Sequence, residues 1–170
     1  VGFDFALHRA AGEPPEEDLA NDWHVDQDSC EPKVQCVQGL LALTDSSPAS
    51  GGTALLQKSH RAHTSLIKRL WQPEWEDTNW EFVPVPANDP IVSNHKQVQP
   101  HLHKGDMLVW DSRTVHKKMP PLDHHTERAV AYVCMVPRSH ASEDVQAERR
   151  RAFTSGIATT HNPSYVAPRR

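Results

Sequence analysis

The sequence has few cysteines and no long hydrophobic run, and its first residues do not resemble a signal segment. Cys30, Cys36 and Cys134 are odd in number and form no CxxC pair, which favours free thiols in a reducing compartment over a disulfide framework. No apolar stretch approaches the roughly 20 residues of a membrane-spanning helix, and no charged segment followed by an apolar one opens the chain. We therefore expect a soluble intracellular protein, with the cytoplasm as its compartment.

The sequence also lacks a strong excess of charge of either sign. It contains 18 Lys and Arg against 22 Asp and Glu, which gives a formal net charge of -4. Such a balance offers no general attraction to phosphate backbones or to anionic membrane surfaces. Nucleic acids and membranes are therefore not expected as partners, and the sequence does not indicate an oligomeric state.

Helical periodicity is scarce, and the chain is predicted to be mostly β. Its 170 residues, 37% of them hydrophobic, suit one domain, and 14 prolines and 7 glycines divide them into short apolar runs. Helical windows are predicted only at residues 63–71, where Leu66, Ile67 and Leu70 share one side, and at residues 143–151. Strands are predicted at residues 1–8, 36–44, 53–56, 104–110 and 128–136.

Residues 71–99 form a segment rich in tryptophan and proline that is predicted to be an insertion. Its tryptophans, Trp71, Trp75 and Trp80, are spaced four and five residues apart. The structural interpretation is a surface excursion held by burial of the aromatic rings. The functional alternative is a lid or a wall of a substrate pocket, because loops of this length often carry function.

The stretch NDWHVDQD, residues 21–28, places His24 and Asp26 two positions apart. On an extended strand, residues i and i+2 project from the same face, so both side chains can enter one cavity while Val25 points away. The spacing alone is a weak indication, because such pairs are common by chance. The ordinary interpretation is a surface histidine and a turn aspartate.

A third ligand would make the pair a metal site, and His116 is the candidate. It follows the predicted strand at residues 104–110 and a polar turn, so we expect it at the rim of a sheet. A closed double-sheet architecture brings an early strand and a late strand together. Two histidines and one carboxylate on one face of a metal leave three open octahedral positions, the arrangement of non-haem Fe(II) oxygenases.

Taken in order, these residues resemble the phytanoyl-CoA dioxygenase family. The resemblance rests on His24 and Asp26, on residues 51–60 (GGTALLQKSH), on residues 105–116 (GDMLVWDSRTVH) and on Arg128, and it covers roughly residues 20 to 138. It implies a double-stranded β-helix (a jelly roll, cupin-like) with a few short helices. Relatives have helical segments ahead of the first barrel strand, and we expect an N-terminal helical part to precede Val1.

The resemblance also implies the chemistry and the roles of four residues. His24, Asp26 and His116 would be the ligands of Fe(II). Arg128, twelve residues after His116, would bind the far carboxylate of 2-oxoglutarate, a task that suits the planar, permanently charged guanidinium. With O2 as the second cosubstrate, the enzyme would hydroxylate an unactivated C–H bond of a small organic or lipid-like molecule.

Two local features bear on this hypothesis. The halogenating relatives replace the carboxylate ligand with a small residue, so the presence of Asp26 favours hydroxylation. Many relatives place a hydroxyl residue just after the distal histidine or after the arginine, whereas this chain has Lys117 and Lys118, and Ala129 and Val130.

Two alternatives remain open. One is a non-catalytic jelly-roll module, a metal-binding or scaffold protein whose site is vestigial or holds zinc. The other is a cupin-like isomerase or lyase, which would not need Arg128. For Arg128 itself, the structural alternative is an ion pair with Asp111 or Glu127.

Five further residues are predicted to have structural roles. Arg113 is expected to pair with Asp111, and Ser59 to order its loop. Gln27 is expected to face away from the metal pair. Gly51, with Gly52, is expected to supply positive φ in a tight turn.

Overall fold

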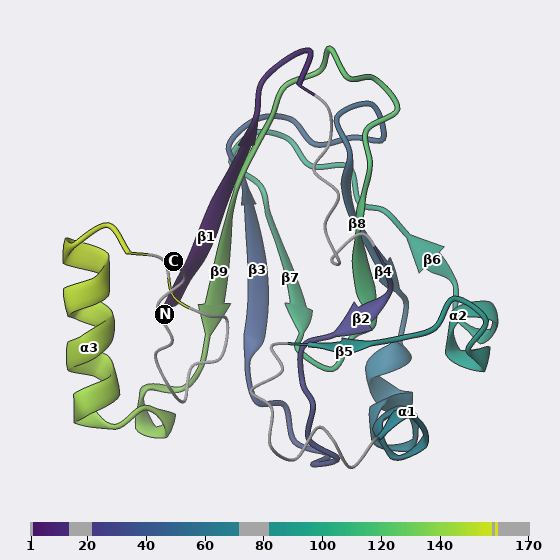
Figure 1. Cartoon of the computed structure of the whole chain (residues 1–170), viewed down its shortest axis with the longest axis vertical. Coiled ribbons are helices and arrows are strands. Elements are labelled where there is room, and N and C mark those ends of the chain that lie inside the picture. The colour runs from purple at the N-terminus through teal and green to yellow at the C-terminus, as the bar shows by residue number, and fades with distance from the viewer. Residues whose placement is uncertain (1, 14–21, 72–81, 158, 160–170) are drawn as a thin grey trace.

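The computed structural model describes residues 2–13, 22–71, 82–157 and 159, and only the backbone of residues 2–7. Its strands form two antiparallel sheets (Figure 1). The major sheet has the order β1 (Gly2–Arg9), β9 (Arg128–Met135), β3 (Val37–Ala42) and β7 (Met107–Asp111). The minor sheet has the order β5 (Val83–Pro84), β2 (His24–Val25), β8 (His116–Met119), β4 (Gly52–Leu56) and β6 (Gln97–Val98).

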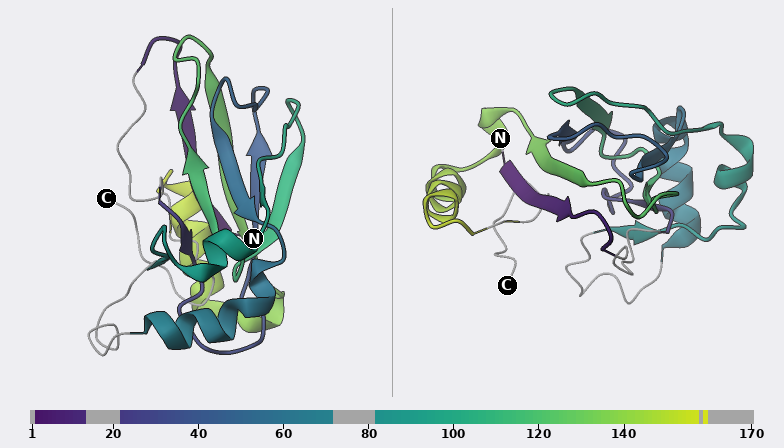
Figure 2. Two further views of the ribbon diagram at one scale, coloured as in Figure 1. Left: turned by 90° about the vertical axis from the view of Figure 1, so that its right-hand side faces the viewer. Right: turned by 90° about the horizontal axis from the view of Figure 1, so that it is seen from above.

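The helices lie at opposite ends of this pair of sheets. Helix α1 (His63–Leu70) follows the 3-10 turn η2 (Ser59–Ala62) and, with α2 (Pro90–Asn94), lies beside the minor sheet. Helix α3 (Glu143–Thr154), which follows the 3-10 turn η4 (Arg138–His140), lies at the far end, beside β1 (Figure 2). Within the described part of the chain, no helix is long and apolar enough to cross a bilayer.

The predicted mostly β fold is confirmed, as are its longer elements. Each of the five predicted strands is present with shifted ends, and both predicted helices form. The sequence pattern does not indicate the elements β2, β5, β6, β8 and α2. These have two to five residues each, which is too short for a recognisable alternation or helical period.

An inner core joins the two sheets. Leu55 of the minor sheet packs with Leu40, Trp110 and Val130 of the major sheet. All four side chains are at most 7% exposed. Apolar contacts therefore fill part of the space between the inner faces of the two sheets.

An outer core lies on the other side of the minor sheet. Ala54 and Leu56 flank Leu55 and so face the opposite way, where they pack with Leu66 and Ile67 of α1. These four residues are completely buried, and full burial of a leucine or isoleucine contributes about 1.5–3 kcal/mol. Helix α1 thus covers the outer face of the minor sheet.

Part of the segment at residues 71–99 belongs to the minor sheet. Strands β5 and β6 form its two edges, and α2 lies between them in sequence. Asp89 caps α2 by accepting a hydrogen bond from Ile91 N, and its carboxylate pairs with Arg69 of α1 at 2.7 Å. Trp71 is 45% exposed, while Trp75 and Trp80 lie outside the described residues.

Gly51 adopts the positive φ predicted for the turn before β4. Its φ is +83°, and a Cβ atom there would lie 2.7 Å from the backbone oxygen of Met119. Gly52 does not have positive φ; a Cβ atom there would instead meet Gln99 Nε2 at 2.9 Å. The glycine pair therefore allows close approach of the chain at the end of β8, in addition to the turn.

Gly51→Ala is expected to destabilise the fold more than Gly105→Ala. Both positions have positive φ, at a cost of about 1–2 kcal/mol for alanine, but nothing lies within 4 Å of a Cβ atom at Gly105. The clash with Met119 should add at least about 1 kcal/mol at Gly51. Denaturant unfolding of both variants measures the difference, and equal losses would show that the contact with Met119 is not restrictive.

His63 is a buried histidine that connects α1 to the loop after β2. Its Nε2 donates to Gln27 O at 2.8 Å, and the residue is 1% exposed. Burial lowers the pKa of His63; the hydrogen bond to Gln27 O acts in the opposite direction without reversing the shift. The folded protein therefore favours neutral His63.

The protein is expected to become less stable as the pH decreases, because folded His63 resists protonation. Below the unfolded pKa of about 6.5, the unfolded chain binds a proton that the folded chain resists, so stability decreases as pH falls from about 7.5 to 5.5, by at most about 1.4 kcal/mol per pH unit. Denaturant titrations at several pH values should show a shallower dependence in His63→Gln, which keeps a donor for Gln27 O. An unchanged slope in this variant would exclude His63 as a cause.

Candidate metal centre

His24 and His116 are neighbours because of the register between β2 and β8. The two residues are directly opposite each other in the antiparallel pair, and opposite residues project from the same face. Their rings lie 4.4 Å apart between centroids. His116 is also opposite Leu55 of β4, whose side chain lies in the inner core. Both imidazoles therefore lie between the two sheets.

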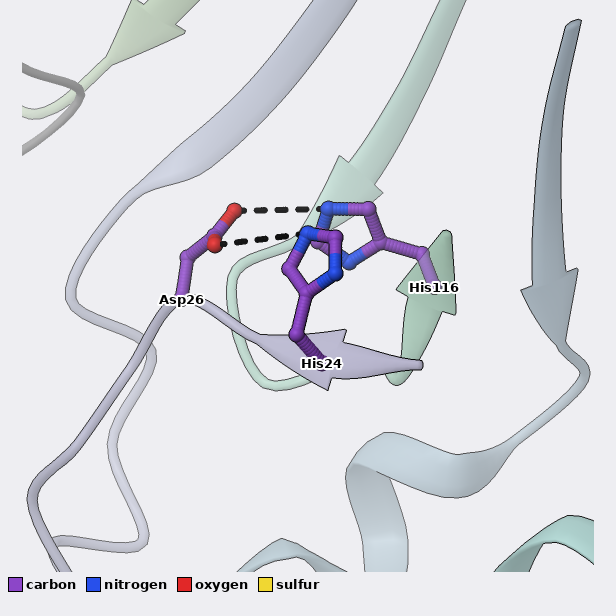
Figure 3. A group of neighbouring side chains, drawn as sticks. All are labelled: His24, Asp26 and His116. Atoms are coloured by element: carbon purple, nitrogen blue, oxygen red, sulfur yellow. Dashed lines mark ion pairs between the residues drawn. The ribbon is translucent and has the colours of Figure 1, made fainter. Parts of the chain in front are cut away.

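Asp26 completes the group from the loop that follows β2 (Figure 3). Strand β2 ends at Val25, so Asp26 follows the strand, and its carboxylate points towards both rings. Oδ1 lies 3.8 Å from His24 Nε2, and Oδ2 lies 3.3 Å from His116 Nε2. One ligand atom from each of the three residues lies within 4.8 Å of the other two. The structure thus brings together all three predicted ligands.

Backbone carbonyls orient both imidazole rings. His24 Nδ1 donates to Asp22 O at 2.8 Å, and His116 Nδ1 donates to Thr114 O at 2.9 Å. A carbonyl can only accept, so in the neutral rings the proton is on Nδ1 and the lone pair is on Nε2. In each histidine, Nε2 is the nitrogen on the side of Asp26.

The electrostatics of the group favour a positive charge beside Asp26. Burial lowers the pKa of His116, but the charge of Asp26 and a hydrogen bond to it raise this pKa, and the net shift is upward. Both histidines are only 6% exposed. A cation that replaced the proton would meet the same attraction, which is the usual coupling between metal binding and proton release.

The residues fit a divalent ion. Ligand atoms about 2.1 Å from an ion, at right angles to each other, would be separated by about 3 Å. One ligand atom from each of the three residues lies within 4.8 Å of the other two, so binding would need a contraction of at most about 2 Å. Two imidazoles and one carboxylate also match the donor set of non-haem Fe(II) sites with open positions.

Arg128 begins β9 and has its side chain on the inner face of the major sheet. It has the same strand parity as Val130 and Tyr132, which pack in the inner core. Arg128 is 3% exposed, yet its Nε and Nη2 atoms have no hydrogen-bond partner among the described residues. A buried charge without a partner is costly, so these atoms mark a place where an anion would be stabilised.

The proposed structural partners of Arg128 are engaged elsewhere. Asp111 pairs with Arg113 at 2.6 Å, which confirms the interpretation of Arg113 as a loop-shaping residue. Burial alone would raise the pKa of Asp111, but the hydrogen bonds from Arg113 lower it below its usual value. Glu127 pairs with His8 at 2.8 Å. Neither carboxylate therefore serves as a structural counter-ion for Arg128.

Gln27 is confirmed as a structural residue. It is completely buried, and its Nε2 donates to Glu31 O and Lys33 O at 3.2 and 3.0 Å. Its Oε1 accepts from Gln35 N and from Ser112 Oγ, at 3.1 and 2.9 Å. The side chain therefore organises the loop between β2 and β3.

Ser59 is confirmed as a loop-ordering residue. Its Oγ accepts from Val115 N at 2.9 Å, and the residue is completely buried. This bond fixes the backbone just before His116. The turn η2 thus supports the position of the distal histidine.

The group also has neighbours that were not predicted to contact it, among them Trp110 and Gln38. The ring of Trp110 lies 5.3 Å from that of His116, between centroids. Gln38 donates from Nε2 to Asp26 Oδ2. The sequence contains one indication of this role: Gln38 is a polar residue at an inward-facing position of the apolar strand predicted at residues 36–44.

Comparison with known proteins reveals related sequences and structures. The family model described as phytanoyl-CoA dioxygenase (PhyH) matches residues 6–118. The chain is also similar to Ava biosynthesis cluster protein O of Aspergillus versicolor, with 24% identity over 147 residues, which are 82% of this chain and 47% of that protein.

Two solved structures share the fold. One is the epimerase SnoN in complex with Fe3+, alpha ketoglutarate and nogalamycin RO, with a TM-score of 0.51 and 18% identity over 76% of this chain and 46% of that one. The other is EctD from S. alaskensis in its apoform, with a TM-score of 0.52 and 15% identity over 76% of this chain and 41% of that one. This chain spans about half the length of these relatives.

The family match includes the three predicted metal ligands and ends before Arg128. It covers more than half of the chain, and the two facing antiparallel sheets are those of a double-stranded β-helix. The chain therefore belongs to the phytanoyl-CoA dioxygenase family.

Proposed function

We propose that this protein is an Fe(II)/2-oxoglutarate-dependent oxygenase that hydroxylates an unactivated C–H bond of a small organic or lipid-like substrate. The observation that carries the proposal is the convergence of His24, Asp26 and His116 between the sheets. Family membership supports it, and so does the solved complex of SnoN with Fe3+ and alpha ketoglutarate (2-oxoglutarate).

His24, Asp26 and His116 would hold the iron. When bound, Fe(II) would supply the activation of O2, coupled to oxidative decarboxylation of 2-oxoglutarate to succinate and carbon dioxide. The chain's own contribution is orientation, because the carbonyls of Asp22 and Thr114 direct both Nε2 lone pairs towards the carboxylate. The apolar inner core would exclude water from the reacting groups.

Arg128 would bind the far carboxylate of 2-oxoglutarate. Its buried Nε and Nη2 atoms can donate in parallel to two carboxylate oxygens. The guanidinium stays charged at any working pH, so binding would not require a proton transfer. Because these atoms have no partner among the described residues, they favour an enzyme over a non-catalytic scaffold. A role for Arg128 in binding 2-oxoglutarate would favour an oxygenase over a cupin-like isomerase or lyase.

Hydroxylation is the outcome that this donor set supports. Asp26 occupies the carboxylate position, which leaves no protein vacancy for a halide ligand. SnoN is an epimerase, so the fold also accommodates other outcomes, and we propose hydroxylation on the basis of Asp26. The three free cysteines support the proposal of an intracellular protein.

His116→Ala is expected to abolish the iron site. Under anaerobic conditions, the protein with Fe(II) and 2-oxoglutarate should show a weak visible charge-transfer band, because the keto acid chelates iron. The variant should lose this band, while His101→Ala, which changes an exposed histidine, should retain it. Tightly held zinc without any affinity for 2-oxoglutarate in the wild-type protein would contradict the proposal and favour the scaffold alternative.

Arg128→Ala is expected to weaken 2-oxoglutarate binding without removing the metal. Loss of charge-assisted hydrogen bonds worth about 1.5–3 kcal/mol corresponds to a dissociation constant raised about 10- to 100-fold. Calorimetric titration of the Mn(II)-loaded protein measures this constant. Arg138→Ala, at an exposed arginine of η4, is the matched control; equal affinities in both variants would remove Arg128 from the cosubstrate site.

A further inference from the structure

Gln38 is a buried polar residue on the inner face of the major sheet. It lies in β3, opposite Trp110 of β7 and Cys134 of β9, and it is 5% exposed. Two positions along the strand, Leu40 faces the inner core, so Gln38 projects into the same space. Its side chain therefore approaches the metal centre from the sheet opposite the two histidines.

The side-chain amide of Gln38 is bonded to one oxygen of Asp26. Nε2 donates to Asp26 Oδ2, the same oxygen that lies 3.3 Å from His116 Nε2. An ionised carboxylate can only accept hydrogen bonds, so the amide must turn its NH2 group towards Asp26. The orientation of Gln38 follows from this requirement.

A comparison with Gln27 separates the roles of the two glutamines. Gln27 makes four hydrogen bonds that organise a loop. In Gln38 the bond to Asp26 is the only side-chain hydrogen bond within the described residues, and its buried Oε1 has no partner there. Gln38 is therefore placed to act on Asp26 and does not hold a segment of backbone.

We infer that Gln38 is a positioning residue that keeps Asp26 as a one-oxygen ligand. The inference rests on the proposed function. Rotation of the carboxylate to bind an ion through both oxygens would compete with the Gln38 hydrogen bond for lone pairs of Oδ2. Two-oxygen binding would also occupy one of the three open octahedral positions, and a bidentate keto acid together with O2 needs all three. Gln38 thus preserves the free part of the coordination sphere.

The number of water molecules on bound Mn(II) tests this inference. The full chain is loaded with Mn(II) alone, and the waters are counted by pulsed electron paramagnetic resonance in 17O-labelled water. Wild type is expected to have three. Gln38→Leu and Gln38→Met, which lack the donor, are expected to have two, because Asp26 binds through both oxygens. Circular dichroism identifies which variant folds, and the Met side chain preserves the length of Gln38.

The matched control is Gln35→Leu, which removes an exposed glutamine whose side chain bonds to Ser29 alone in the part of the chain that the structure describes. It should retain three waters. At saturating Mn(II), the Gln38 variants should also bind 2-oxoglutarate about 10-fold more weakly than this control, at the lower end of the losses in metal affinity or activity that follow removal of a group orienting a metal ligand. Three waters in a folded Gln38 variant would overturn the inference. Failure of wild type to bind 2-oxoglutarate would instead contradict the proposed function, since the water count does not depend on it.

Discussion

The pairing of His24 with His116 across β2 and β8 is the constraint on which the site depends. Because side chains alternate along a strand, a slip of one residue in this register would turn one imidazole into the outer core. Strand β2 has only two residues, so its own hydrogen bonds cannot hold the register. Packing holds it instead: Val25 and Val115, the neighbours of the two histidines, are completely buried in the outer core.

The same alternation divides the minor sheet into a structural face and a chemical face. Its outer face is apolar and covered by α1, whereas its inner face carries the histidines. The major sheet adds Gln38 and Arg128 to the inner space, each with a buried polar atom that lacks a partner among the described residues. Such atoms reduce the stability of a folded chain. Their presence on this inner surface agrees with the expectation that a fold departs from stabilising rules at functional sites.

The fold class and the grouping of the three candidate metal ligands could be predicted from sequence, for reasons specific to these residues. The long strands, such as β3 and β9, carry apolar runs that a short-range pattern can reveal. His24 and Asp26 are close in sequence, so strand geometry alone suggested their shared direction. The link from His24 to His116, 92 residues further on, rested on the place of His116 after a predicted strand and on the family resemblance.

Other features depend on contacts that no short-range pattern contains. Strand β8 has four residues, most of them polar, and it exists because β2 and β4 flank it. Whether Arg128 has a carboxylate partner depended on the orientation of the Asp111 and Glu127 side chains. Asp111 pairs with Arg113, and Glu127 pairs with His8. The contact of Gln38 with Asp26 crosses from one sheet to the other, so only the packed sheets reveal it.

The most direct test of the central claim is anomalous X-ray scattering at the iron edge from crystals prepared anaerobically with Fe(II) and 2-oxoglutarate. The account predicts one anomalous peak between the sheets, about 2.1 Å from His24 Nε2, His116 Nε2 and one oxygen of Asp26. A peak elsewhere in the molecule, or none at these three residues, would contradict it.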